Sequence, residues 1–226
     1  MKKVLESLRS GLIVSCQAEP GDPFNEPEKV ALFAKAAIMG GAVGIRSEGL
    51  DKIVQIKKQV IIPVIGLIKS QFEDGFVKIT GSFGDVESLL EAGCDIISID
   101  GTMRIREGLC GPEFIALVKE KYNCTVMADI STFEEGIACM NAGADCISTT
   151  LSGYTPYTIT GSELPDSELV CQLVKEISIP VFAEGRINTP QLAKQMFENG
   201  AWAVVVGTAI TRPRVITKWF VDKINE

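Results

Sequence analysis

The amino-acid sequence predicts a single-domain α/β protein, a TIM-type (β/α)8 barrel that occupies residues 1–226. Two short phrases recur along the chain and alternate with each other. In the first, a Gly and a small residue precede a β-branched run, at 41–48, 93–100, 143–150 and 200–207. The second is a short apolar run, at 11–18, 62–69, 124–131 and 179–186. We expect these phrases to form eight strands, each with a helical pattern after it.

The expected strands are nearly continuous apolar runs rather than alternating ones, which is typical of parallel strands buried on both faces. Eight βα units in 226 residues require about 28 residues each, close to the ~250 residues of an ordinary (β/α)8 barrel. A doubly wound sheet also alternates strands and helices, but this regular repetition favours a closed barrel. No linker or low-complexity tract divides the chain.

Helix signals lie between the strands. Thr132 and Glu135 have the spacing of a capping box before a helix at 132–143, and Thr189 with Pro190 opens a later helix. Asp166 caps a helix with an apolar face formed by Leu169, Val170, Leu173, Val174 and Ile177. The last helix has the same spacing at Val215, Ile216, Trp219, Phe220 and Ile224. The loops at 70–84 and 151–165 are long, and we expect them to contribute to function.

The composition predicts a folded protein that does not bind nucleic acid. Apolar residues make up 46% and charged residues 23%, and the net charge is −7 with no basic run. The longest apolar run, 201–210, is about half of a membrane span, and the first ten residues form an amphipathic helical pattern rather than a signal peptide. We therefore expect a cytoplasmic protein with no membrane partner.

The counts of cysteine and histidine narrow the chemistry. The seven cysteines contain no CxxC pair, so we expect reduced residues of the core rather than a disulfide framework or a zinc site. The chain has no histidine, which excludes His-dependent nucleophile systems and His-ligated metals. We expect neither a metal nor a cofactor. Acid/base chemistry must then come from Lys, Asp, Glu, Tyr or Cys.

The active site of a (β/α)8 barrel lies at the carboxyl ends of the strands. The polar residues expected there are Gln17, Arg46, Lys69, Asp100, Asp129, Thr149, Thr150, Glu184 and Thr208. Lys69 follows an apolar run, so burial and nearby cations would lower its pKa and suit it to act as a base or a Schiff-base nucleophile. Glu184 lies on the opposite side of the ring, where it completes an acid/base pair.

Two further strand-end residues, Asp129 and Arg46, have two interpretations each. Asp129 orients Lys69 or binds a substrate hydroxyl, or else it forms a structural ion pair. Arg46 binds an anion or an enolate oxygen, or forms a surface salt bridge with Glu48. Asp100 is a weaker candidate than Asp129.

Two loops after the last expected strands predict a phosphate site. In these barrels a phosphate commonly binds to the backbone N–H groups of the loops after strands seven and eight. Here those loops are EGRIN at 184–188 and GTAITRP at 207–213. Glycines allow close approach to the backbone, and the other side chains supply a hydroxyl and positive charge. The candidate phosphate-binding residues are Gly185, Arg186, Gly207, Thr208 and Arg212.

The chain resembles the N-acylmannosamine-6-phosphate 2-epimerases of bacterial sialic acid breakdown, a family of the ribulose-phosphate-binding barrel superfamily. The resemblance covers the chain nearly end to end, in GLIVSCQA, GAVGIRSEG, IPVIGLIK, MADISTFEEG, STTLSGYT, FAEGRINTP and AVVVGTAITRP. It implies interconversion of N-acetylmannosamine 6-phosphate and N-acetylglucosamine 6-phosphate by proton transfer at C2 of the open-chain sugar, without metal or nucleotide.

The resemblance also implies roles for single residues. Lys69 and Glu184 are the expected acid/base pair, and Arg212 lies near the phosphate. The expected substrate contacts are Gln17, Arg46, Asp129, Tyr154 and Thr155. The segment 99–114 departs from the family pattern at Gly101 and Glu107.

Other functions remain open from the residues alone. A Schiff-base aldolase would use Lys69 as the nucleophile on a phosphorylated sugar or keto acid, and a non-catalytic phosphosugar-binding protein would leave the C2 proton in place. Ribulose-phosphate 3-epimerase is disfavoured because that relative uses metal-bound histidines. Trp202, Trp219 and Phe220 near the last helix suggest a homodimer through that end.

Overall fold

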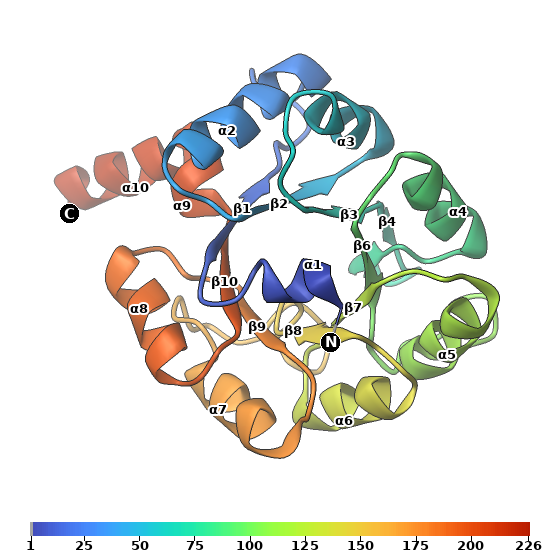
Figure 1. The fold of residues 1–226 in the computed structure, drawn as a ribbon. Helices are drawn as coiled ribbons and strands as arrows, with labels where there is room; N and C mark the ends of the chain where they lie inside the picture. Colours follow the sequence, from blue (N-terminus) through green and yellow to red (C-terminus); the bar gives the residue numbers. More distant parts are fainter. Residues whose placement is uncertain (1) are drawn as a thin grey trace.

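The computed structural model of the protein describes residues 2–226. Within this range, eight parallel strands close into a barrel in which β10 pairs with β1 (Figure 1). In order around the ring they are β1 (Leu12–Cys16), β2 (Gly44–Glu48), β3 (Val64–Leu67), β6 (Ile96–Asp100), β7 (Val126–Asp129), β8 (Cys146–Ser148), β9 (Val181–Glu184) and β10 (Ala203–Val206). The predicted (β/α)8 barrel is confirmed.

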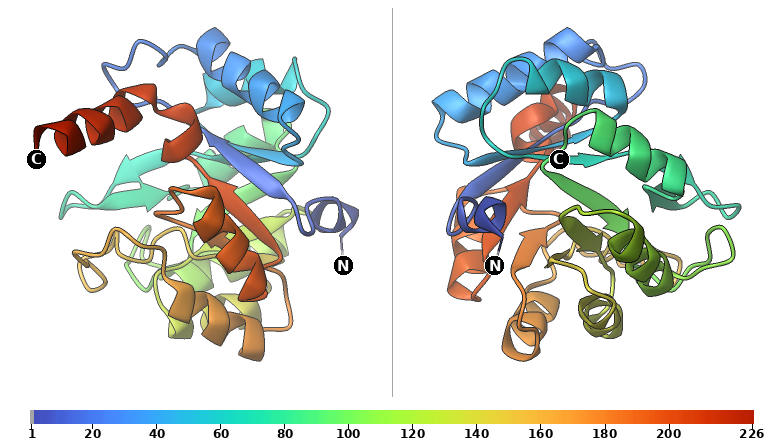
Figure 2. Two further views of the ribbon diagram at one scale, coloured as in Figure 1. Left: turned by 90° about the vertical axis from the view of Figure 1, so that its left-hand side faces the viewer. Right: turned by 45° about the vertical axis from the view of Figure 1, so that its right-hand side comes forward.

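Helices surround the barrel on the outside (Figures 1 and 2). They are α2 (Pro27–Met39), α3 (Leu50–Lys57), α4 (Phe83–Glu91), α5 (Gly111–Lys121), α6 (Phe133–Asn141), α7 (Ser167–Glu176), α8 (Pro190–Glu198), α9 (Thr208–Thr211) and α10 (Pro213–Asn225). The predicted helix caps are confirmed, because the side chains of Thr132, Asp166 and Thr189 each accept a backbone N–H at the start of a helix. The capping box at Thr132 is complete.

The N-terminal segment closes one end of the barrel. Helix α1 (Lys3–Glu6) has four residues, so the helical pattern expected over the first ten residues is too long, and Met1 lies outside the described range. The helix ends early because the chain must turn back into β1, and Ser10 adopts a φ of 56° at this turn. Leu5 and Leu8 are buried against the barrel interior, and α1 lies across the ring in Figure 1.

Apolar and polar side chains divide the barrel interior. Leu5, Leu8, Ile13, Ile65 and Phe182 belong to an apolar cluster that fills the end near α1. The other end holds the buried polar side chains Arg46, Ser98, Asp129 and Ser148. Since side chains pack the N-terminal end, room for a ligand is left at the carboxyl ends of the strands.

The structure corrects the sequence prediction after the third strand. A single strand and loop were expected through 62–84, but β3 ends at Leu67 and Lys69 begins β4 (Lys69–Gln71), which pairs antiparallel with β5 (Val77–Ile79). The physical cause is the Asp74-Gly75 turn, in which Gly75 has a φ of 83°. Lys69 therefore lies on a hairpin, opposite Ile79 in the register.

The divergent segment after β6 supports this hairpin. The Arg104 guanidinium lies 4.1 Å from the centroid of the Phe72 ring and donates a hydrogen bond to Val77 O at 3.1 Å. Arg104 and Arg106 also pair with Asp100, at 3.1 and 2.9 Å. Asp100 thus has a structural role, in agreement with its lower rank as a site candidate.

The last helix projects away from the barrel (Figures 1 and 2). None of the residues of α10 is buried, and Phe220, Val221 and Ile224 are exposed together with Trp219. Within residues 2–226, no helix combines the length and the apolar character needed to cross a membrane.

Candidate active site

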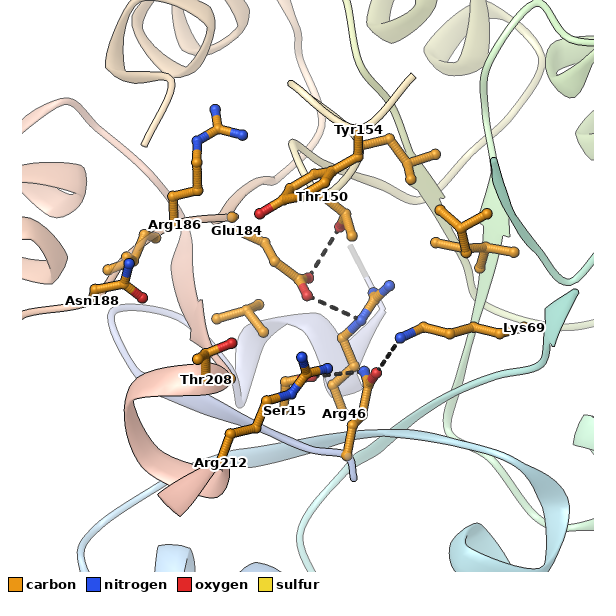
Figure 3. Close-up of a pocket in the computed structure, with 18 residues that line it drawn as sticks. Ser15, Arg46, Lys69, Thr150, Tyr154, Glu184, Arg186, Asn188, Thr208 and Arg212 are labelled. Atoms are coloured by element: carbon orange, nitrogen blue, oxygen red, sulfur yellow. Dashed lines mark hydrogen bonds and ion pairs between the residues drawn. The ribbon is translucent and has the colours of Figure 1, made fainter. Parts of the chain in front are cut away.

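A cavity of about 280 Å³ opens at the carboxyl ends of the barrel strands (Figure 3). It is lined by both members of the expected acid/base pair and by all five expected phosphate-binding residues. The lining residues are Ser15, Gln17, Arg46, Lys69, Val77, Ile79, Thr150, Leu151, Tyr154, Glu184, Gly185, Arg186, Ile187, Asn188, Val205, Gly207, Thr208 and Arg212.

Lys69 extends from the hairpin toward the centre of the cavity (Figure 3). Its ammonium donates a hydrogen bond to Gln17 Oε1 at 2.6 Å, and Gln17 in turn donates to Ser15 Oγ at 2.8 Å. The side chain is open to the water of the cavity, although protein surrounds it on most sides. Burial and the positive charges of Arg212 and Arg46 lower the pKa of Lys69, against an opposing effect of Glu48. Lys69 therefore loses its proton more easily than an ordinary lysine.

Glu184 ends β9, on the opposite side of the ring from β3. Its side chain is 13% exposed. Oε2 accepts a hydrogen bond from the Thr150 hydroxyl at 3.0 Å, and Oε1 lies 3.4 Å from Arg46 Nε. Burial raises the pKa of the Glu184 carboxyl, Arg46 opposes this effect, and Asp129 reinforces it. Glu184 therefore keeps a proton more readily than an ordinary glutamate.

Arg46, which lines the cavity, forms a buried ion pair with Asp129. Arg46 Nη2 lies 2.7 Å from Asp129 Oδ2, and the two side chains are 1% and 0% exposed. The Ser98 hydroxyl bonds to both residues at 2.7 Å. Asp129 thus forms the structural ion pair that was one of its two predicted roles. The predicted salt bridge between Arg46 and Glu48 is not found among the described residues, because Glu48 pairs with Lys52 instead.

Lys69 and Glu184 approach the cavity from opposite sides (Figure 3). Burial favours the neutral form of each group, so it lowers the pKa of Lys69 and raises the pKa of Glu184. Two such groups on opposite faces of one carbon atom can remove and return a proton. The placement of the two side chains is compatible with the acid/base roles that the sequence predicts for them.

The five expected phosphate-binding residues line this cavity, but the side chain of one of them, Arg186, is not directed into it. Gly185, Gly207 and Thr208 line it, and so does Arg212, which forms an ion pair with Glu19. The Arg186 side chain points away from the cavity in Figure 3.

Arg186 instead fastens the long loop at 151–165. Its Nη1 donates to Ser152 O at 2.6 Å and its Nε to Leu164 O at 2.7 Å. The guanidinium also lies 5.4 Å from the centroid of the Tyr154 ring. The charge of Arg186 therefore faces the loop rather than the cavity, which does not agree with the phosphate contact expected of this side chain.

The same loop contains the two expected substrate contacts at 154 and 155. Tyr154 lines the cavity, whereas Thr155 is not among the described residues that do. Thr155 is fully buried and its hydroxyl lies 2.6 Å from that of Thr158, so it shapes the loop.

Sequence reasoning missed several residues of the site. Ser15 and Asn188 line the cavity, and Ser98 joins the buried ion pair. A period of two would have found Ser15, because residues two apart on a strand face the same side and Ser15 is two residues from Gln17. No local pattern marks Glu19, the partner of Arg212.

Fold and cavity together define the class of the protein. It is a (β/α)8 barrel with a pocket at the carboxyl ends of its strands, where a lysine and a glutamate line the same cavity. Among residues 2–226 there is no group of three or more Cys, Asp or Glu side chains arranged to hold a metal ion.

The chain belongs to the N-acetylmannosamine-6-phosphate epimerase family, whose model matches residues 30–226. It is 52% identical over 225 residues to the N-acetylmannosamine-6-phosphate 2-epimerase of Caldanaerobacter subterraneus, covering 99% of this chain and 94% of that one. It is 49% identical to the Clostridioides difficile protein of the same name, covering 98% and 99%.

A solved structure agrees with this membership. The N-acetylmannosamine-6-phosphate 2-epimerase from Clostridium perfringens superposes with a TM-score of 0.91 and 43% sequence identity, covering 98% of this chain and 96% of that one.

Proposed function

We propose that the protein interconverts N-acetylmannosamine 6-phosphate and N-acetylglucosamine 6-phosphate by proton transfer at C2. The observation that carries the proposal is the placement of Lys69 and Glu184 on opposite sides of one cavity, with pKa values shifted toward each other. The names of the relatives supply the substrate.

The chemistry requires an acyclic sugar in the cavity. The C2 proton is acidic only when C1 is an aldehyde, so the reactive form is the open chain, and loss of the proton gives an enolate. One member of the Lys69/Glu184 pair removes the proton from one face, and the other returns a proton to the opposite face. The reverse reaction exchanges the two roles.

The remaining cavity residues bind and orient the sugar. Arg212 and the Thr208 hydroxyl bind the phosphate together with the backbone at Gly185 and Gly207. Gln17 and Tyr154, which line the cavity, contact the sugar chain. Arg46, fixed by Asp129, presents positive charge near the developing enolate.

The test is an exchange experiment in D₂O. N-acetylmannosamine 6-phosphate is incubated with the protein, and the C2 position is followed by proton NMR. We expect N-acetylglucosamine 6-phosphate with deuterium at C2. Binding of the sugar phosphate without product and without C2 exchange would contradict the proposal and favour a non-catalytic phosphosugar-binding protein.

The same sample separates epimerisation from Schiff-base chemistry. An aldolase would form an imine between Lys69 and the substrate carbonyl, which borohydride reduces to a stable adduct. We expect no mass increase on Lys69 after borohydride treatment with the sugar phosphate present. A covalent adduct on Lys69 would support the aldolase.

We also propose a homodimer that covers α10. Support comes from the exposed apolar side chains Trp219, Phe220, Val221 and Ile224 on a helix with no buried residue of its own. We expect light scattering to report a dimer for the wild type and a monomer for Phe220→Glu. A monomeric wild type at micromolar concentration would contradict this proposal.

A cytoplasmic location completes the proposed function. Its support is that all seven cysteines are free thiols, a state favoured in a reducing compartment. The negative net charge gives no support for a nucleic-acid partner.

A further inference from the structure

The hairpin β4–β5 carries Lys69 on two strands of three residues each. A two-stranded hairpin is at best marginally stable by itself, so its position depends on contacts with the rest of the protein. Its first strand has no buried residue, and in the left view of Figure 2 the hairpin projects from the mouth of the barrel. The lysine of the site therefore lies on an element that needs support from outside.

The base of the hairpin is fixed to the barrel. The N–H of Thr80 donates to Ile68 O at 2.7 Å, and the N–H of Ile68 donates to the Thr80 hydroxyl at 3.3 Å. Thr80 is fully buried and has a φ of 49°, which is rare for a β-branched residue. Ile79 belongs with Leu67 to a small apolar cluster. These contacts fix the chain up to Ile68, and Lys69 is the next residue.

Arg104 connects the distal half of the hairpin to the barrel. Its guanidinium lies 4.1 Å from the centroid of the Phe72 ring, and its Nη2 donates to Val77 O at 3.1 Å. The same Nη2 lies 3.1 Å from Asp100 Oδ2, and Nε donates to Thr102 Oγ1 at 3.2 Å. The Arg104 side chain is only 10% exposed. One nearly buried side chain thus joins both strands of the hairpin to the end of β6.

Asp100, the residue of β6 that Arg104 contacts, has other partners that hold it in place. Arg106 Nη2 donates to Asp100 Oδ1 at 2.9 Å, and Arg106 Nη1 donates to the Asp100 carbonyl at 2.8 Å. The Thr102 hydroxyl donates to the same Oδ1 at 2.6 Å. Loss of the Arg104 charge therefore leaves the buried Asp100 carboxylate paired, and the barrel should still fold.

We propose that Arg104 is a positioning residue that sets the direction in which the hairpin presents the Lys69 amine to the cavity. The inference rests on the proposed function, in which Lys69 transfers a proton. Without Arg104 the hairpin keeps the contacts of its base but loses those that link Phe72 and Val77 to the end of β6. A rotation about the base then turns Lys69, and the amine at the end of its four-carbon stem moves furthest.

This role predicts an effect on kcat rather than on KM. A displacement of about 1 Å in a reacting group can lower a rate by roughly 10²-fold. Arg104 is not among the described residues that line the cavity, so it does not bind the sugar phosphate itself. The expected phosphate-binding residues lie on the loops at 184–188 and 207–213, which Arg104 does not contact through any described hydrogen bond.

The first test compares two substitutions of Arg104. Arg104→Met keeps an unbranched stem but removes the charge and the donors, whereas Arg104→Lys keeps the charge. We expect kcat to fall roughly 5- to 50-fold in Arg104→Met, with KM within about twofold of wild type, and to recover in part in Arg104→Lys. Unchanged kcat in Arg104→Met would overturn the inference.

Arg9→Met is the matched control. The Arg9 guanidinium lies 4.7 Å from the centroid of the Trp202 ring, near the end of the barrel that α1 closes. This variant also loses a contact between an arginine and an aromatic ring, but it should keep the kcat of the wild type. An equal fall of kcat in Arg9→Met and Arg104→Met would contradict a specific role for Arg104.

A double mutant shows whether Arg104 acts through Lys69. In the Lys69→Ala background, Arg104→Met should change the residual turnover by less than about twofold, because the amine that it positions is already absent. General damage to the protein would lower turnover by the same factor in both backgrounds. Equal factors in the two backgrounds would therefore overturn the inference.

Hydrogen exchange, followed by mass spectrometry, measures the hairpin itself. Amides within 69–79 should exchange faster in Arg104→Met than in the wild type or in Arg9→Met. Unchanged exchange there would show that Arg104 does not restrain the hairpin. If Arg104→Met does not fold, Phe72→Leu removes the ring from the same contact and should lower kcat and speed exchange in the same way.

The proposed function is tested separately by C2 exchange of the wild type in D₂O. A wild type that exchanges C2, together with unchanged kcat in Arg104→Met, contradicts the role of Arg104 alone. A wild type that binds the sugar phosphate but does not exchange C2 contradicts the proposed function, and with it the role of Arg104 in positioning Lys69 for proton transfer.

Discussion

Lys69 donates a hydrogen bond to Gln17 Oε1 at 2.6 Å, which ties the hairpin β4–β5 to the end of β1. The contact places the amine inside the cavity, within reach of Arg212 and across from Glu184. Loss of the amine should therefore remove chemistry without removing the cavity.

Lys69→Ala should lower turnover by roughly 10²- to 10⁴-fold, because a positioned acid/base group contributes about that much. Binding of the sugar phosphate and the melting temperature should remain close to wild type, since Lys69 belongs to no apolar cluster. The matched control is Lys35→Ala on the exposed side of α2. Near-normal turnover in Lys69→Ala would remove Lys69 from the mechanism.

Glu184→Gln keeps the shape of the side chain but can neither take nor give a proton. We expect turnover to fall by roughly 10²- to 10⁴-fold while the fold persists. Glu198→Gln serves as the control, because that carboxylate is 64% exposed and pairs only with Lys194 on α8 among the described residues. Full activity of Glu184→Gln would indicate that one base, Lys69, handles both proton transfers.

The pH dependence follows from the two pKa shifts. At low pH both Lys69 and Glu184 are protonated and the pair lacks a base, and at high pH both are deprotonated and the pair lacks an acid. Because burial moves the two pKa values toward each other, kcat/KM should be bell-shaped in both directions, with limbs closer together than unshifted Glu and Lys would give. A flat profile up to the ordinary pKa of lysine would contradict the lowered pKa of Lys69.

Arg212→Ala should raise KM by roughly ten- to hundredfold, because a hydrogen bond to a charged group contributes about 1.5–3 kcal/mol. The variant also leaves Glu19 without this partner, which adds repulsion toward the phosphate. Arg214→Ala is the control, since Arg214 contacts Glu19 at 3.1 Å but does not line the described cavity. Equal KM values for the two variants would place the phosphate elsewhere.

Gly153→Ala tests whether the hydrogen bonds from Arg186 to Ser152 and Leu164 restrain the loop at 151–165. A Cβ at 153 would lie 2.3 Å from Arg186 Nη1, at a φ of 83°. The strain of about 1–2 kcal/mol should lower the melting temperature by roughly 2–8 °C and speed proteolysis within 151–165.

Gly161→Ala is the control in the same loop, because a Cβ there meets nothing within 4 Å. KM should rise only in Gly153→Ala, since Tyr154 lines the cavity. Wild-type stability and proteolysis in Gly153→Ala would show that Arg186 does not restrain the loop.

The barrel and its helix caps could be predicted because their signals are local. A buried parallel strand is recognisable from its own apolar run, and Thr132, Asp166 and Thr189 lie next to the helices that they cap. Lys69 and Glu184 were recognisable as strand-end residues for the same reason. The prediction of one strand running through Lys69 is wrong. An isolated hairpin of two three-residue strands has too little periodicity to be distinguished from a loop.

By itself, then, the sequence determined the ring of strands, the end of the barrel where chemistry occurs, and the residue types available without histidine. Only the tertiary structure decided which of those residues act on each other. Arg46 contacts Asp129 rather than Glu48, Arg186 binds the loop that contains Tyr154, and Thr150 joins two carboxylates. These partners come from different strands and loops, and closure of the barrel, not neighbouring sequence, brings them together.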